Sequence, residues 1–284
     1  MMRFFFLKHN PVVVGIYNAL LSYRCKSVKR FFFVATTGRS GSESLSEAFK
    51  IVPGAVSLHE PYPVMYNDYA AEMDRDKYFE RIFWKVKRIN IKRAAAGHAY
   101  YLETNHQFVK NFIASAMACF QEKIGVIHLV RDPVKVAASF FAVGSIPGKT
   151  PQGKLYLLNP TDETNTIQIS DLLFSRQDFA HDYFKCLWYW YETEARIKQL
   201  KQQYASVPWI RLETEALNSV DKMKNFFCQL NVDVDHDQLK SLVGIRRNTK
   251  GRNKTQVIGQ AECDAMHEKL KKEMEKRYGP EFWR

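Results

Sequence analysis

The sequence of 284 residues predicts an α/β protein in three layers, with a central, mostly parallel β-sheet flanked by helices. Short apolar runs alternate along the chain with longer segments of helical period, which is the pattern of a parallel sheet covered on both faces. The apolar run Phe31–Thr36 also breaks into a Gly/Ser/Arg loop that leads directly into a helical segment. The length suits one large domain, and without an internal repeat or a Gly/Ser linker we expect a single domain over residues 1–284.

Five strands are expected, each a short apolar run. In chain order they are Phe31–Thr36, Ala55–Leu58, Ala99–Leu102, Lys123–Val130 and Val207–Leu212. Ligands of parallel sheets bind beyond the carboxyl ends of the strands. Polar clusters follow four of the five strands, and we expect them to converge on one edge of the sheet. These clusters are Gly38–Ser42, His59-Glu60, Glu103–His106 and Arg131-Asp132.

Helices are expected between and after the strands. The clearest segments are Ser42–Lys50, Asp68 to about Lys92, Gln107–Phe120, the run that opens at Asp132-Pro133, Asp178–Gln203, Leu217–Leu230 and a charged helix at the end of the chain. Asp132 suits an N-cap and Pro133 a first helical position. Residues 144–177 lack a clear period and are expected to form an irregular segment that covers a substrate.

The first 28 residues are expected to be a helical appendage that packs on the domain. Polar residues interrupt their apolar runs, and neither run approaches the ~20 apolar residues that span a bilayer. We therefore expect no transmembrane segment, with contact to a membrane surface as the alternative.

Composition narrows the partners and the compartment. A net charge of +12 points to an anionic partner, although the basic residues are scattered and a solvated basic surface is the alternative. The five cysteines are an odd number without a Cys-x-x-Cys pair, so neither a disulfide framework nor a zinc site is indicated. A reducing compartment fits best, and we expect a cytoplasmic protein.

The loop Gly38–Ser44 is the strongest candidate for an anion-binding site. A strand–loop–helix unit of this kind presents backbone N–H groups and a positive helix end to a phosphate or sulfate. Gly38 and Gly41 let the backbone approach a ligand, while Arg39 adds a permanent charge. The loop lacks the Gly-Lys-Ser/Thr ending of a nucleotide P-loop. An ordinary tight turn between strand and helix is the alternative.

Arg131 marks a second candidate anion site. It follows the strand Lys123–Val130, and its guanidinium suits bidentate contacts to a phosphate. Ser139 lies two helical turns further on and adds a hydroxyl donor. The alternative is an ordinary surface ion pair between Arg131 and Asp132.

Together the two motifs resemble the cofactor signatures of the sulfotransferases that use 3′-phosphoadenosine 5′-phosphosulfate (PAPS). Their sequences look closest to those of the carbohydrate and tyrosylprotein branches, because the small-molecule branch usually has Lys where this chain has Arg39. The two segments are Arg39-Ser40-Gly41-Ser42 and Leu129-Val130-Arg131-Asp132-Pro133. The segment Arg211–Leu217 is similar to one that follows a late strand in the family. The resemblance runs from about Phe31 to Leu230.

This resemblance implies a P-loop NTPase-like sulfotransferase fold, PAPS as the cofactor and no metal. In the family the first loop holds the 5′-phosphosulfate, and the Arg and Ser of the second motif hold the 3′-phosphate. A late basic segment, here Arg246–Lys254, is expected to close over that phosphate, although the motif is only loosely matched. The cofactor residues expected from the resemblance are Thr37, Gly38, Arg39, Ser40, Gly41, Ser42, Glu43, Ser44, Arg131, Ser139 and Arg252.

Sulfuryl transfer needs a base to deprotonate the acceptor hydroxyl, beside positive charge such as that of Arg39. Glu60 is the first choice, because the carbohydrate and tyrosylprotein branches have a Glu at a similar distance after the loop. His106 is the second, because the small-molecule branch has a His at a comparable place before the Arg of the second motif. Glu103, His59 or the absence of a general base remain open.

The sequence therefore predicts a PAPS-dependent sulfotransferase that acts on a hydroxyl, expected to belong to a carbohydrate, and that binds no nucleic acid. A kinase using ATP is disfavoured by the missing Gly-Lys-Ser/Thr and the lack of an acidic strand end for magnesium. A non-enzymatic basic module for a glycan or nucleic acid explains the charge but leaves Glu60 and the paired loops unexplained. Oligomeric state is open.

Overall fold

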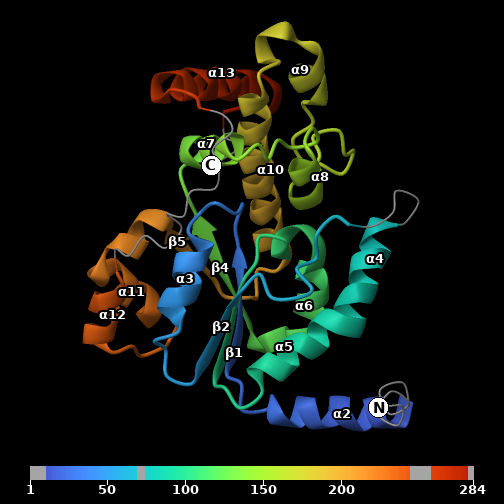
Figure 1. The fold of residues 1–284 in the computed structure, drawn as a ribbon, viewed down its shortest axis with the longest axis vertical. Coiled ribbons are helices and arrows are strands. Elements are labelled where there is room, and N and C mark those ends of the chain that lie inside the picture. The colour runs from blue at the N-terminus through green and yellow to red at the C-terminus, as the bar shows by residue number, and fades with distance from the viewer. Residues whose placement is uncertain (1–10, 69–73, 244–256, 281–284) are drawn as a thin grey trace.

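A computed structural model describes residues 11–68, 74–243 and 257–280 of the chain. Within these residues five parallel strands form one sheet in the order β2-β3-β1-β4-β5 (Figure 1). The strands are β1 (Arg30–Ala35), β2 (Ala55–His59), β3 (Tyr100–Thr104), β4 (Ile124–Val130) and β5 (Trp209–Glu213). Each expected strand is present within two residues of its expected start and end, so the α/β class with a parallel sheet is confirmed.

Helices cover both faces of this sheet (Figure 1). On one face lie α3 (Ser42–Phe49), α11 (Val220–Gln229) and α12 (His236–Leu242). On the other lie α4 (Arg75–Ile82), the π-helical turns η1 (Phe83–Lys87) and η2 (Phe108–Phe112), α5 (Arg88–Ala95) and α6 (Ile113–Phe120). Short 3₁₀ turns occupy η3 (Gln121–Lys123), η4 (Gln177–Phe179) and η5 (Thr214–Asn218).

The alternation of side chains along β1 explains why the sheet is buried on both faces. Phe31, Phe33 and Ala35 pack toward α4, α5 and α6, whereas Phe32 and Val34 pack toward α3 and α11. Every residue of β1 after Arg30 is buried. Such a strand appears in the sequence as a continuous apolar run, which is why it was predictable.

A third group of helices stands above the carboxyl ends of the strands (Figure 1). It comprises α7 (Pro133–Ala142), α8 (Pro151–Tyr156), α9 (Ser170–Ser175), α10 (Asp182–Gln203) and α13 (Gln260–Tyr278), which share one apolar core. The long helix α10 contributes Trp188 and Tyr189 to this core, and both are completely buried. These helices cover the carboxyl edge of the sheet, where the polar clusters were expected.

The expectation of an irregular segment over residues 144–177 was wrong in part. The segment contains α8, α9 and the start of η4. Hydrogen bonds also attach the segment to α10. Trp188 donates to the carbonyl of Ile167 at 2.9 Å, and the buried carboxylate of Glu192 accepts from the backbone N–H groups of Thr166 and Ile167. Two six-residue helices are too short to show a helical period in the sequence.

The N-terminal appendage contains one described helix, α2 (Pro11–Arg24). It lies beneath the end of the sheet where the strands begin, beside α5 (Figure 1). Leu21 is buried against the domain, while most of the other described side chains of α2 are exposed. Among the residues that the structure describes, no helix is long and apolar enough to cross a membrane.

Candidate active site

The turn between β1 and α3 has the backbone geometry of an anion-binding loop. Gly38, Arg39 and Gly41 all have positive φ angles, of 82°, 56° and 81°. A Cβ at Gly38 would lie 3.3 Å from the His106 ring and one at Gly41 2.9 Å from Leu217, so a side chain at either position would add crowding to a backbone conformation that already favours glycine. Arg39 holds a conformation that is unfavourable for an L residue, and such strain concentrates at functional sites.

Two hydroxyls that were expected to hold the cofactor are instead used inside the loop. The Thr37 and Ser40 hydroxyl oxygens lie 3.0 Å apart, and both hydroxyls contact the carbonyl of Gly38. Thr214 donates to the carbonyl of Ser40 at 2.7 Å and to that of Val130 at 3.0 Å, which ties the loop to the end of β4. These side chains hold the shape of the loop, and its ligand-facing groups are the backbone and the residues that follow.

Direct hydrogen bonds join the two expected anion motifs. Arg131 donates to the carbonyl of Arg39 at 2.7 Å, and Arg39 Nε donates to the Ser139 hydroxyl at 2.8 Å. Ser139 therefore supports Arg39 and does not line the cavity, in contrast to its expected contact with a 3′-phosphate. The arrangement fixes both guanidinium groups before any ligand arrives.

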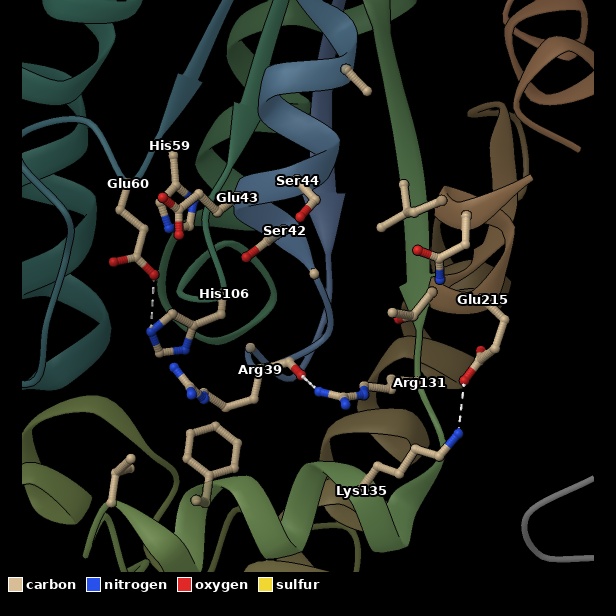
Figure 2. Close-up of a pocket in the computed structure, with 18 of the residues that line it drawn as sticks. Arg39, Ser42, Glu43, Ser44, His59, Glu60, His106, Arg131, Lys135 and Glu215 are labelled. Atoms are coloured by element: carbon tan, nitrogen blue, oxygen red, sulfur yellow. Dashed lines mark hydrogen bonds and ion pairs between the residues drawn. The ribbon is translucent and has the colours of Figure 1, made fainter. Parts of the chain in front are cut away.

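These elements enclose a cavity of ≈ 1160 Å³ at the carboxyl edge of the sheet. Nine of the expected site residues line it: Gly38, Arg39, Gly41, Ser42, Glu43, Ser44, Glu60, His106 and Arg131. Thr37, Ser40 and Ser139 lie behind the lining, and Arg252 lies outside the described residues. Figure 2 shows Glu60 and His106 facing each other on one side, the Lys135–Glu215 pair on the other, and Ser42 and Ser44 on α3 between them.

Glu60 and His106 form a pair in the structure, although the sequence presented them as competing candidates. Glu60 Oε1 lies 3.5 Å from His106 Nε2. Both line the cavity, but the Glu60 side chain is 29% exposed and that of His106 only 11%, so the carboxylate is the more accessible group. Glu60 also has a positive φ of 46°, while its backbone N–H donates to the carbonyl of Thr104 and extends the pairing of β2 with β3 by one residue.

A buried lysine, Lys110, sets the state of His106. Its Nζ lies 2.8 Å from His106 Nδ1 and also contacts the Tyr156 carbonyl at 2.7 Å and the Tyr189 hydroxyl at 3.2 Å. Since Tyr189 donates its own proton to the Thr37 carbonyl, all three partners accept, and they match the three hydrogens of an ammonium group. With Lys110 as an ammonium donor, His106 Nδ1 accepts and the ring proton is assigned to Nε2, which lies 3.5 Å from Glu60 Oε1 and 3.4 Å from the Gln107 amide nitrogen.

Burial lowers the pKa of His106 well below its usual value, and the neighbouring Lys110 lowers it further. Burial likewise lowers the pKa of Lys110, against the opposing effect of Glu60. A neutral His106 that carries its proton on Nε2 cannot accept another proton at that nitrogen. Of the two groups, Glu60 is the more exposed and is the candidate base, with His106 as its neighbour at 3.5 Å.

A buried ion pair supports the same segment from behind. Lys87 Nζ lies 2.6 Å from Glu103 Oε1, and the two side chains are 1% and 0% exposed. Lys87 also donates to the carbonyl of Pro61 at 2.8 Å, next to Glu60. Glu103 accepts further hydrogen bonds from Tyr101 and Asn105. Glu103 has no access to a substrate and is excluded as a base, whereas His59 lines the cavity but is bound through Nδ1 to Thr104.

Several residues that line the cavity were not among those expected from the sequence. Lys135 and Glu215 are exposed and 3.3 Å apart, at the Arg131 end. Tyr66 and Tyr156 meet edge to face with ring centres 4.7 Å apart, at the Glu60 end. Lys135 lies one turn after Asp132 on a predicted helix, which was a usable signal, whereas Tyr66 lies outside any helix or strand and Tyr156 ends α8, in a segment expected to be irregular.

No protein-family model and no curated protein matches the sequence. Three solved structures are similar in fold. The sulfotransferase domain from the curacin biosynthetic pathway is 13% identical, with 80% of this chain and 81% of that one covered and a TM-score of 0.47. The sulfotransferase domain of the Synechococcus PCC 7002 olefin synthase is 14% identical, with 85% of this chain and 94% of that one covered and a TM-score of 0.45. A sulfotransferase from Alicyclobacillus acidocaldarius is 13% identical, with 88% of this chain and 96% of that one covered and a TM-score of 0.48.

Proposed function

We propose that this protein is a sulfotransferase that moves a sulfuryl group from PAPS to an acceptor hydroxyl. The observation that carries the proposal is a single cavity with positive groups at one end and a partly exposed carboxylate at the other. The Gly38–Ser44 turn and Arg131 supply the former, and Glu60 supplies the latter. Glu43 and Glu215 also line the cavity, so the distinguishing feature of Glu60 is its place at the end away from Arg131, beside His106.

The donor set suits a nucleotide with two anionic groups. The backbone N–H groups of the turn and the N-terminus of α3, with the Ser42 and Ser44 hydroxyls, would hold the phosphosulfate. Arg131, with Lys135 beside it, would hold the 3′-phosphate. When bound, PAPS supplies an electrophilic sulfuryl group and a phosphate leaving group. The volume of ≈ 1160 Å³ leaves room for an acceptor as well.

At the Glu60 end of the cavity, each residue has a separate role in the proposed transfer. Glu60 would accept the proton of the acceptor hydroxyl while the hydroxyl oxygen forms its bond to sulfur and the bond between sulfur and the leaving phosphate oxygen breaks. His106, whose Nε2 lies 3.5 Å from one carboxylate oxygen, would hold Glu60 in place while the other oxygen meets the substrate. Arg39 offsets the negative charge that builds on the transferred group and on the leaving phosphate.

We further propose a carbohydrate as the acceptor, in keeping with the resemblance of the two motifs. The tyrosine pair beside Glu60 supports this choice, because aromatic faces and edges pack on the apolar faces of sugars. Gln152 and Ser145, which also line the cavity, add groups that hydrogen-bond to hydroxyls.

Calorimetric titration with adenosine 3′,5′-bisphosphate, ATP and ADP tests the cofactor. We expect the bisphosphate to bind at least about tenfold more tightly than either adenine nucleotide that lacks a 3′-phosphate, because one extra charged contact is worth ~1.5–3 kcal/mol. A preference for ATP would overturn the proposal and favour a kinase. No binding of any of the three would favour a module for another anion.

Glu60→Gln tests the base. We expect unchanged affinity for adenosine 3′,5′-bisphosphate and a turnover lower by roughly 10²–10⁴-fold. Glu194 is a matched control. It lies 2.9 Å from His128 Nε2, and His128 in turn contacts Lys201, but Glu194 does not line the cavity. Glu194→Gln should retain turnover. Full activity in Glu60→Gln would refute the assignment.

A further inference from the structure

Helix α2 carries an exposed apolar stripe that the proposed function does not use. Val12, Ile16, Leu20 and Tyr23 are 67%, 57%, 57% and 68% exposed. Their spacing of four, four and three residues places them on one side of the helix. Leu21, which is 4% exposed, is directed toward the domain, so the helix is anchored while the stripe faces solvent. A continuous exposed apolar surface of this kind marks an interaction site.

Basic side chains flank this stripe and are fixed to the helix. Arg93 donates to the Tyr17 hydroxyl at 2.9 Å, Lys92 donates to Ser22 at 3.0 Å, and the Lys26 ammonium lies 5.3 Å from the centre of the Tyr23 ring. Arg24 and Lys29 add exposed positive charge at the end of α2.

The same face is depleted of acidic residues. The described chain has no Asp or Glu from Pro11 to Ser42, and none from Arg81 to Leu102, the stretch that contains α5. These two stretches are far apart in sequence but adjacent in the fold, where α2 packs against α5 (Figure 1). Glu122, whose backbone carbonyl accepts from Arg30, is an acid at the margin. Basic side chains of α2 and α5 therefore lie beside the apolar stripe, and these two stretches place no acidic residue among them.

We propose that this α2/α5 face binds the surface of an anionic lipid bilayer. Apolar side chains insert between the headgroups while the surrounding lysines and arginines contact lipid phosphates, which is how interfacial helices bind. With 14 residues, α2 is shorter than the ~20 that span a bilayer, so it lies in the interface. A second copy of the chain is a poor occupant, because two such faces would repel each other. The cavity lies at the opposite edge of the sheet and stays open to solution.

Co-sedimentation of the full chain with vesicles tests this proposal. We expect binding to phosphatidylcholine vesicles that contain phosphatidylglycerol to be at least about tenfold tighter than to phosphatidylcholine alone, and to weaken as salt is added. Ile16→Ser/Leu20→Ser should weaken binding at least about tenfold, and Arg24→Gln/Lys26→Gln should reduce the salt dependence. Phe174→Ser, which alters an apolar side chain that is 50% exposed on α9, is the control and should bind as the parent does.

All of these side chains are exposed, so circular dichroism melts should be unchanged and a loss of binding is not a loss of fold. Equal binding of Ile16→Ser/Leu20→Ser and the parent would overturn the proposal, as would equal binding to neutral and anionic vesicles. A dimer in light scattering that the same variant dissociates would identify a second copy as the occupant and also overturn it.

Discussion

Lys87→Met removes the cation of the buried pair behind the proposed base. Glu103 is 0% exposed in its side chain, and its Oε1 lies 2.6 Å from Lys87. Methionine fills much of the volume of lysine but leaves Glu103 as an uncompensated buried charge. Breaking a buried pair in this way costs about 3–5 kcal/mol. For a chain of this size each kcal/mol lowers the melting temperature by ~2–4 °C, so we expect a decrease of roughly 6–20 °C.

Thermal melting followed by circular dichroism measures this effect, with Lys77→Met as the matched control. Lys77 pairs with Asp74 at 3.0 Å on the surface, with side chains that are 83% and 51% exposed. An exposed pair contributes ~0–1 kcal/mol, so the control should melt near the parent. A decrease of less than about 2 °C in Lys87→Met would refute the assigned cost.

The double variant Lys87→Met/Glu103→Gln separates stability from positioning. Glutamine removes the stranded charge, so most of the lost stability should return. The Pro61 carbonyl still lacks its donor, and Glu60 beside it should remain misplaced. We therefore expect turnover to stay low while the melting temperature recovers. If turnover and stability recover together, Lys87 has only a structural role.

Three further outcomes follow from the geometry. The pKa of His106 is lower in the folded chain than in the unfolded chain, so as pH falls the unfolded chain binds this proton first and the free energy of unfolding should decrease below pH ~6.5. His106→Gln should make the free energy of unfolding less dependent on pH, as measured by urea titrations at pH 7 and 5. An unchanged pH dependence would contradict this. Arg131→Ala should remove the preference for adenosine 3′,5′-bisphosphate over the 5′-monophosphate, about 10–100-fold by calorimetry, and a retained preference would place the 3′-phosphate elsewhere. Gly153→Ala should destabilise the fold by at least ~1–3 kcal/mol, since its Cβ would lie 1.8 Å from the Ile146 carbonyl, whereas Gly15→Ala, with nothing within 4 Å, should not; equal melts would refute the clash.

The sheet was predictable because its strands are short and buried on both faces. The stretch Phe31–Ala35 then carries no polar residue, and the glycines that follow mark the end of the strand. The convergence of Gly38–Ser44, Glu60, His106 and Arg131 on one cavity was predictable for the same reason, since parallel strands place their carboxyl ends together.

What the sequence left undetermined depends on side-chain direction. Residue types indicated hydroxyls at Thr37, Ser40 and Ser139, but not that the loop uses the first two and Arg39 the third. Lys110 resembles an ordinary polar position on a predicted helix, and only its contact with His106 gives it a role. Glu60 and His106 seemed to be alternatives because sequence separation says nothing about their distance in space.

The hydrogen bonds that join the two anion motifs have a thermodynamic consequence. Since Arg131 holds the Arg39 carbonyl and Arg39 holds Ser139, the two halves of the site are set at one separation before binding. A ligand with two suitably spaced anionic groups then loses little of the protein's conformational entropy on binding, while a ligand with one such group contacts only half of a site that is already ordered. Discrimination among nucleotides would accordingly follow the spacing of their phosphates more than their size or total charge.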